Sequence, residues 1–355
     1  MTRIINVIVV DDSAFMRKSI SIMLESDKDI KVIATARDGE EGYNLTKKLH
    51  PDLVTMDIEM PKMDGLKALQ KIMNDCPVPV IMVSSLTTEG AESTIKAFEY
   101  GAVDFIPKEL SYINVNIIKI KQELIKKVKE IVKQVSIRER FIRLRKIKGP
   151  QHHEINVSGA KYLPKISYKA VALGISTGGP LSLQKIIPQL SIKINCPVFI
   201  VQHMPPKFTK SLADRLDSLS ELKVKEAENR EEVRGGVVYI APGGLHMTVD
   251  RNNLGTFFVS ISEEPSASLH RPSVDVMMDS VVDGYGKNTL GVIMTGMGKD
   301  GLEGIRKLKQ TGGYCLAQDE ESSVVYGMPK AIAEAGFADV IAPLDKISEI
   351  INKAF

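Results

Sequence analysis

The sequence has few cysteines and no long hydrophobic run, and each shortage excludes a class of protein. Its three cysteines lie far apart and form neither a CxxC motif nor a Cys/His cluster, so we expect no disulfide framework and no zinc site. No apolar run approaches the ~18 residues of a membrane helix, and the apolar stretch at the N-terminus is too short for a secretory signal. We therefore expect a cytoplasmic protein without membrane insertion.

The sequence also has little net charge, and the charge that it has lies in one segment. The chain carries +3 overall, but Lys119–Lys148 alone holds twelve Lys/Arg and three Glu. The rest of the chain is therefore acidic, and a solvated helix explains the basic segment better than a polyanion-binding surface does. We expect no nucleic-acid partner.

The order of apolar patterns predicts two α/β domains in the 355 residues. Five short β-branched runs alternate with amphipathic stretches, which favours a parallel, doubly wound sheet. These runs are 5–10, 30–36, 52–57, 78–84 and 103–108. From Ile117 a helical spacing continues to Gly149-Pro150 and an aperiodic linker follows. A second α/β alternation begins near Ser167.

Polar residues stand at the ends of four strands predicted in the first domain. Asp11 and Asp12 follow the first strand, Asp57 the third, Ser84 the fourth and Lys108 the fifth. Any one aspartate could simply cap a helix. Together, however, they supply crowded carboxylates that a hard cation such as Mg²⁺ would neutralise, together with a lysine, which is a set suited to phosphoryl transfer onto a carboxylate.

The motifs VVDDS, TMDIEMPKMDG, VSS and DFIPK closely resemble those of the response-regulator receiver domain. The resemblance implies a flavodoxin-like, five-stranded parallel domain at residues 1–112, with Asp57 accepting a phosphoryl group from a chemotaxis histidine kinase. It also implies Mg²⁺ on Asp12, Asp57 and the Glu59 carbonyl, with Asp11 acting through water. Ser84, Phe105 and Lys108 are then the switch residues.

The second domain contains a serine in a glycine-rich turn. VALGISTGGP indicates a strand, a turn and a helix, with Ser176 in a G-x-S-x-G pattern. Such a turn is typical of a nucleophile, but phosphate-binding loops have the same features.

Two later strand ends favour the nucleophile. His203 ends PVFIVQHM and Asp300 lies in a glycine-rich loop, so a serine, an imidazole and a carboxylate can converge in one cleft. The glycines around Met297 can direct its backbone N–H at an oxyanion. The other histidines are interpreted as loop, linker or structural residues, namely His50, His152, His153, His246 and His270. For Arg271, recognition of a substrate carboxylate and a plain loop position remain equally open.

The ordered motifs GISTGGP, VQHMPP, HRPSVDVM, TGMGKDG and VYGMPKA closely resemble the catalytic domain of the chemotaxis protein-glutamate methylesterases (CheB family). The resemblance implies Ser176 as nucleophile, His203 as general base, Asp300 as orienting acid, Met297 as oxyanion donor, and Thr177 beside the nucleophile. It implies a doubly wound, mainly parallel α/β esterase domain at 167–355 without a cofactor, after a basic helical linker at 113–166.

The implied reaction is hydrolysis of glutamate γ-methyl esters, and deamidation of glutamines, on the cytoplasmic domains of methylated chemoreceptors. Our hypothesis is that the unphosphorylated receiver domain inhibits the esterase. Two other classes remain open: a response regulator with a non-catalytic output module, and a small-molecule esterase that carries a receiver domain.

Overall fold

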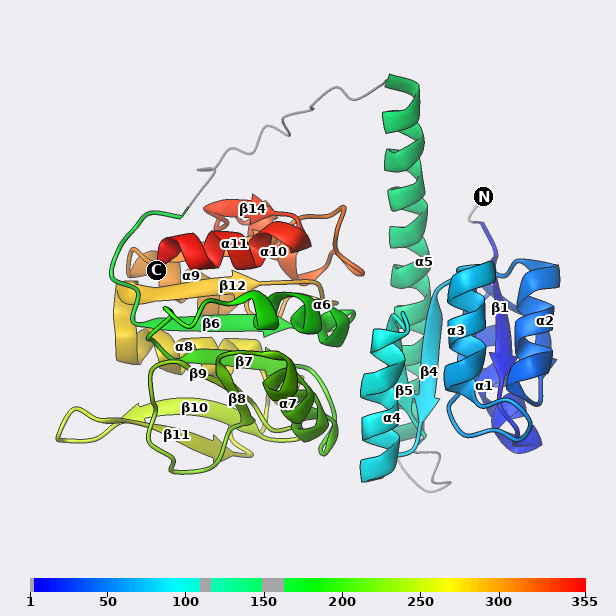
Figure 1. Ribbon diagram of the computed structural model, residues 1–355, viewed down its shortest axis with the longest axis horizontal. Helices are drawn as coiled ribbons and strands as arrows, with labels where there is room; N and C mark the ends of the chain where they lie inside the picture. The colour runs from blue at the N-terminus through cyan, green and yellow to red at the C-terminus, as the bar shows by residue number, and fades with distance from the viewer. Residues whose placement is uncertain (1–2, 109–115, 149–162) are drawn as a thin grey trace. The chain divides into compact units, whose positions relative to one another are not determined.

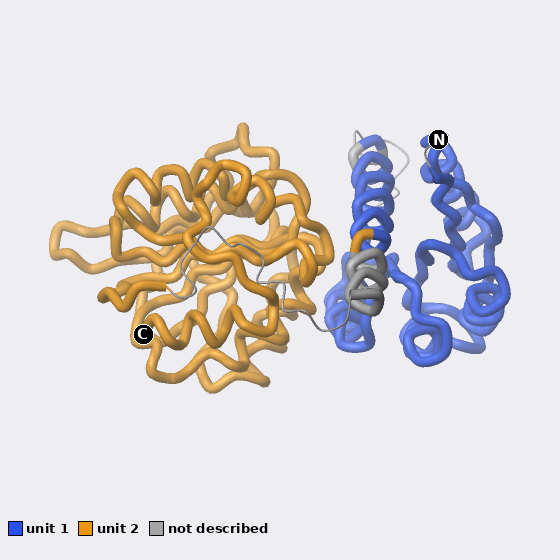
Figure 2. The backbone as a smooth tube through the Cα atoms, turned by 90° about the horizontal axis from the view of Figure 1, so that it is seen from above, with its two compact units in different colours: residues 1–136 blue, residues 137–355 orange. Residues whose placement is uncertain are grey.

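The chain forms two compact units in a computed structural model that describes residues 3–108, 116–148 and 163–355. The units are Met1–Ser136 and Ile137–Phe355, drawn blue and orange in Figure 2. Each unit is described by itself. No helix among the described residues is long and apolar enough to cross a membrane.

The N-terminal unit is a five-stranded parallel sheet with the strand order β2-β1-β3-β4-β5. This confirms the predicted sheet. Its strands β1, β4 and β5 are labelled in Figure 1. The strands are β1 (Ile5–Val10), β2 (Ile30–Ala36), β3 (Leu53–Asp57), β4 (Val80–Ser84) and β5 (Asp104–Pro107). The helices are α1 (Ala14–Glu25), α2 (Gly39–Leu49), α3 (Gly65–Asp75), α4 (Thr88–Glu99) and α5 (Asn116–Lys148).

Side chains cap the first four helices of this unit at their N-termini. Ser13, Asp38, Asp64 and Thr87 each accept a hydrogen bond from a backbone N–H in the first turn. These short polar residues satisfy donors that the helix itself leaves free. These caps therefore fix where the first four helices begin, in the loops that follow the strand ends.

The long helix α5 packs its early turns against the N-terminal sheet. Leu124, Val128 and Ile131 are buried, at the three- and four-residue spacing expected of one helix face. Within the same face, the buried Lys127 ammonium group donates to the Phe105 carbonyl oxygen at 3.0 Å and pairs with Asp104 at 3.0 Å. The domain limits 1–112 and 113–166 stay predictions, and most of the predicted linker after Gly149 lies outside the described residues.

The C-terminal unit is built on a seven-stranded sheet with the order β14-β13-β12-β6-β7-β9-β8. Every pairing in it is parallel. The strands are β6 (Ala170–Ile175), β7 (Val198–Gln202), β8 (Lys223–Glu226), β9 (Val237–Ile240), β12 (Thr289–Ile293), β13 (Tyr314–Gln318) and β14 (Val340–Ala342).

Helices cover both faces of this sheet, as right-handed crossovers require (Figure 1). One layer holds α6 (Gly179–Ile186), η1 (Ile187–Gln189), α7 (Phe208–Leu219) and α11 (Leu344–Ala354), which contact one another. The other holds α8 (Val274–Tyr285), η2 (Gly286–Asn288), α9 (Leu302–Gln310) and α10 (Met328–Glu334).

An antiparallel hairpin that the sequence analysis did not predict extends the second layer. Its strands are β10 (His246–Arg251) and β11 (Phe257–Ser262), and β10 packs on α8. Met247, Val249 and Val259 of the hairpin are buried in the same hydrophobic core as α8. The unit is therefore a parallel sheet with one separate hairpin, consistent with the prediction of a mainly parallel domain.

Candidate functional site

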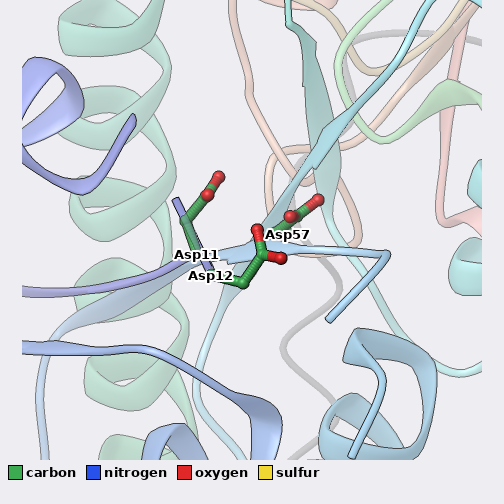
Figure 3. Close-up of side chains that lie close together, drawn as sticks. All are labelled: Asp11, Asp12 and Asp57. Carbon is green, nitrogen blue, oxygen red and sulfur yellow. The ribbon is translucent and has the colours of Figure 1, made fainter. Parts of the chain in front are cut away.

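Three carboxylates meet at the edge of the N-terminal sheet. Asp11 and Asp12 directly follow β1, and Asp57 ends β3, the strand next to it. Each offers an oxygen, and these oxygens all lie within 4.8 Å of one another. Figure 3 shows the three side chains grouped at the ends of these strands. The predicted acidic pocket is therefore present.

Lys108, which follows β5, supplies the positive charge in this pocket. Its Nζ lies 2.6 Å from Asp57 Oδ2 and 3.3 Å from Asp11 Oδ2. Burial raises the pKa of Asp57 to about 6, with Lys108 opposing the shift and the Asp11 charge adding to it. Burial also raises the pKa of Asp11 against the effect of Lys108. One lysine does not fully balance the carboxylates.

The donor set fits a hard divalent cation. Asp11 Oδ2 and Asp57 Oδ2 are buried and, although they are close to Lys108, neither has a hydrogen bond of good geometry. Oxygen ligands from one or two carboxylates are what Mg²⁺ prefers. A cation here would contact both of these oxygens, with Asp12 as the exposed third ligand.

The remaining residues predicted in this pocket are placed as follows. The Glu59 backbone N–H donates to the Asp57 carboxylate. Ser84 ends β4, but its buried hydroxyl donates to the Gly90 carbonyl oxygen at 3.0 Å and not to Asp57. The Phe105 ring is buried and meets Phe98 edge-on, with centroids 6.2 Å apart. The hydroxyl and the ring therefore both belong to the β4–β5 side of the sheet.

In the C-terminal unit, three adjacent strands bring the other predicted residues to one edge. Strand order places β6 between β12 and β7. Ser176 follows β6, His203 follows β7, and Asp300 lies in the loop after β12. The carboxyl ends of parallel strands meet at the same edge, which is where such sheets bind ligands.

His203 and Asp300 are in direct contact. His203 Nε2 lies 2.8 Å from Asp300 Oδ2, and both side chains are about nine-tenths buried. A proton on Nε2 then points at the carboxylate, which leaves Nδ1 as the basic nitrogen. The ring of His270 stacks on that of His203, with centroids 4.4 Å apart. The imidazole is therefore oriented by a carboxylate at its edge and by a second ring on its face.

Asp300 is held at the N-terminus of α8. Besides His203, its donors are the Ser273 hydroxyl and the backbone N–H groups of Val274, Asp275 and Gly301. Burial alone would raise the pKa of Asp300, but the contact with His203 and the backbone hydrogen bonds lower it well below its usual value. The carboxylate is therefore ionised and fixed.

The turn that carries Ser176 makes close contacts with the loop after β12. Ser176 N–H donates to the Thr295 carbonyl oxygen at 2.9 Å, and a Cβ on Gly296 would lie 2.9 Å from Ser176 Cβ. Gly178 has a φ of 76°, which favours glycine. The structure shows no hydrogen bond from the Ser176 hydroxyl to any described residue, so the contact between Ser176 and His203 stays a prediction.

Two backbone donors flank this serine. The N–H groups of Met297 and Thr177 make no hydrogen bond within the described part of the chain. The Thr177 N–H shares its peptide plane with the Ser176 carbonyl group, whose oxygen accepts from Gly179 N–H at 2.7 Å and from Gln202 Nε2 at 3.0 Å, which fixes that plane. Their roles as oxyanion donors stay a prediction.

The structure also places the residues that the sequence left open. His246 starts β10 and is fully buried, so it is a strand residue and not the loop residue we expected, because the hairpin was missed. The Arg271 guanidinium group pairs with Glu263 at 3.4 Å. Ser273 and His270 were missed as site residues. The only signal for Ser273 was its place ahead of a helical pattern.

Comparisons with known proteins agree with this architecture. Residues 7–116 match the response regulator receiver domain, and residues 171–351 match the CheB methylesterase family. The chain is 47% identical over 356 residues to the protein-glutamate methylesterase/protein-glutamine glutaminase of Pyrococcus horikoshii, covering 100% of this chain and 94% of that protein. It is 45% identical to the corresponding Thermotoga maritima protein, covering 98% and 97% of the two chains.

A solved structure shows the same relationship for the second unit. The crystal structure of the Thermotoga maritima CheB methylesterase catalytic domain matches with a TM-score of 0.51 and 48% identity, covering 54% of this chain and all of that one. These matches define the chain as a response regulator with an enzymatic output domain. It belongs to the CheB family of protein-glutamate methylesterases/protein-glutamine glutaminases.

Proposed function

We propose that this chain hydrolyses glutamate γ-methyl esters on the cytoplasmic domains of chemoreceptors, with Ser176 as nucleophile. The observation that carries the proposal is the 2.8 Å contact between His203 and Asp300 at the sheet edge where Ser176 emerges. A serine hydroxyl attacks an ester only when a base takes its proton, and an oriented imidazole is such a base.

The steps follow from these positions. His203 Nδ1 takes the Ser176 proton as the serine oxygen bonds to the ester carbonyl carbon. The N–H groups of Met297 and Thr177 stabilise the oxyanion. His203 then returns the proton to the departing methanol. Water, deprotonated by His203, then attacks the acyl carbon. The bond from that carbon to Ser176 Oγ breaks, His203 returns the proton to Ser176 Oγ, and the glutamate carboxyl group is released. With a glutamine substrate the same steps release ammonia.

Asp300 acts in both steps without taking a proton. Its low pKa keeps it ionised while His203 becomes an imidazolium ion, so that the two opposite charges form at 2.8 Å in a largely buried site. The five donors around Asp300 hold it in place at this point of the reaction.

We further propose that phosphorylation of Asp57 regulates this activity. Mg²⁺ held by Asp11, Asp12, Asp57 and the Glu59 carbonyl would supply the positive charge that phosphoryl transfer needs. Lys108 neutralises the product phosphate, and a chemotaxis histidine kinase is the donor. The unphosphorylated receiver domain inhibits the esterase domain, and a change on the Ser84 and Phe105 side relieves it.

The catalytic proposal is tested by methanol release from methylated receptor membranes. Ser176→Ala should abolish release, and a serine-hydrolase activity probe should label wild-type protein but not this variant. Substantial release by Ser176→Ala would overturn the assignment. Labelling of Ser176 without activity on receptors, but with activity on small esters, would favour a small-molecule esterase.

The regulatory proposal is tested with a small-molecule phosphodonor and Mg²⁺. Both should raise methanol release by the intact chain, and Asp57→Ala should keep basal release but lose the increase. Equal stimulation of wild type and Asp57→Ala would exclude Asp57 as the phosphoacceptor.

A further inference from the structure

One buried amide joins the two loops that carry Ser176 and His203. Gln202 is the last residue of β7 and lies opposite Ile175, the last residue of β6. Its side chain is buried, and Nε2 donates to the Ser176 carbonyl oxygen at 3.0 Å and to the His203 carbonyl oxygen at 3.2 Å. A primary amide has two N–H donors, so both bonds form at once.

These two bonds lie where the sheet no longer holds the strands together. Beyond Ile175 and Gln202, the remaining ladder contact is a 3.3 Å hydrogen bond from His203 N–H to the Ile175 carbonyl oxygen. The next residues on each side are Ser176 and His203 themselves. The Gln202 amide therefore links the two loops that carry the proposed nucleophile and base, and the relative position of such groups is a quantity to which reaction rates are very sensitive.

The oxygen of the same amide accounts for the glycine at position 179. Gln202 Oε1 is buried against the first turn of α6, where a Cβ on Gly179 would lie 1.8 Å from it. Gly179 has no positive φ, so its backbone conformation does not require glycine. The close approach of the Gln202 amide does require glycine at position 179. Gly179 and Gln202 therefore depend on each other.

We propose that Gln202 is a positioning residue of the esterase, which sets the distance between the Ser176 and His203 loops. It acts through their backbone carbonyl groups and touches no reacting atom. The inference rests on the proposed roles of Ser176 and His203.

Gln202→Met tests it, because methionine fills a similar volume but has no N–H donor. The full-length chain is activated with phosphodonor, and active sites are counted with the serine-hydrolase probe. We expect kcat per active site for methanol release to fall by about 10- to 100-fold with KM changed by less than about twofold. A purely structural role would lower the number of active sites and leave kcat per site unchanged.

Gly179→Ala tests the same arrangement without altering Gln202. Alanine favours a helix, so the variant should fold, but its Cβ must displace the amide. We expect a fall in kcat per site in the same direction. Ser348→Ala in α11 is the control, because α11 carries no predicted site residue. The substitution removes a 2.7 Å hydrogen bond from the Ser348 hydroxyl to the Gln189 side chain of η1. Its kcat per site should equal that of wild type.

Two outcomes would overturn the inference. One is wild-type kcat per site in Gln202→Met, or in Gly179→Ala if the methionine variant does not fold, while Ser176→Ala is inactive. The other is an equal loss in Ser348→Ala, which would make the effect one of stability. Full activity of Ser176→Ala would instead reject the proposed function, and this inference with it.

Discussion

Asp57 and Asp300 are both buried carboxylates at the edge of a parallel sheet, yet their pKa values shift in opposite directions. Burial raises the pKa of Asp57 to about 6. Asp300 is also buried, but its pKa falls well below the usual value. Burial penalises the ionised form in both places, so the difference comes from the groups that each carboxylate faces.

The surroundings of the two side chains differ in the number of donors. Asp300 accepts hydrogen bonds from His203, the Ser273 hydroxyl and three backbone N–H groups. Asp57 faces Lys108 on one side and the carboxylate of Asp11 on the other, and its Oδ2 has no hydrogen bond of good geometry. A saturated carboxylate suits a fixed charge, whereas one held by a single lysine can bind a cation beside it or attack phosphorus.

The substitution Asp300→Asn should have the largest effect, because it removes the charge of the carboxylate whose pKa is lowered. The amide has no charge to stabilise imidazolium, and its NH₂ group would face the donors that now bind a carboxylate. We expect kcat for methanol release to fall by about 10⁴-fold, the effect of this change in a well-studied serine protease. The measurement is release from receptor membranes, with Asp279→Asn on the exposed face of α8 as control. A loss below tenfold would show that His203 does not depend on this charge.

The substitution Lys127→Met adds a third buried carboxylate, Asp104, to the comparison of Asp57 and Asp300. Asp104 pairs with the buried Lys127 at 3.0 Å. Removing the ammonium group leaves an uncompensated buried charge, so we expect the free energy of unfolding to fall by about 3–5 kcal/mol. Urea denaturation of the full chain measures it.

The matched control for Lys127→Met lies on the same helix. Lys133 is exposed and reaches Glu130 only at 3.9 Å. Lys133→Met should therefore change the free energy of unfolding by about 1 kcal/mol or less. Adding Asp104→Asn to Lys127→Met should restore part of the lost stability. Equal effects of the two lysine variants would show that the buried pair contributes no more to the free energy of unfolding than the exposed pair does.

Asp57→Asn tests the sign of the shift in the N-terminal unit. Because the folded pKa of about 6 lies above the ordinary 3.8, the stability that Asp57 contributes is present below the ordinary value and lost as pH rises through about 6. Asparagine cannot ionise. Without divalent cations, the variant should be more stable above pH 6 by about 1–3 kcal/mol.

Thermal unfolding of the full chain across pH 4–8 in chelator measures this effect. The advantage of Asp57→Asn should grow between about pH 4 and about pH 6 and then stay constant. Mg²⁺ should reduce this stability advantage of the variant, because a cation binds the wild-type carboxylates preferentially. A stability difference between the variant and wild type that does not depend on pH would mean that ionisation of Asp57 does not destabilise the folded protein.

The sequence predicted the strands well, and with them which polar residues stand at the strand ends. The predicted runs 5–10 and 30–36 coincide with β1 and β2, and the other three differ by one or two residues. Buried strands read as short β-branched runs, and parallel topology then brings their ends to one edge. Asp11, Asp57 and Lys108 met in space for this reason.

What the sequence did not show depends on tertiary contacts. The hairpin of β10 and β11 lies outside the βα alternation, and its core residues pack on α8. The contact of Ser273 with Asp300 joins residues 27 positions apart, and the stacking of His270 on His203 joins two loops. Nothing in local spacing encodes such pairs, because each needs the fold to bring two chain segments together.

Ser273→Ala removes one donor from the saturated carboxylate. Ser273 Oγ donates to Asp300 at 2.9 Å and accepts from Val276 N–H as the N-cap of α8. Losing the cap should lower the free energy of unfolding by about 1 kcal/mol. The remaining donors keep Asp300 ionised, so kcat should fall by less than about tenfold. Ser273→Thr keeps the hydroxyl and should restore both values. If alanine instead reduced kcat as much as Asp300→Asn does, the low pKa of Asp300 would depend on this one hydroxyl and not on the helix N-terminus, and the contrast with Asp57 would rest on a single side chain.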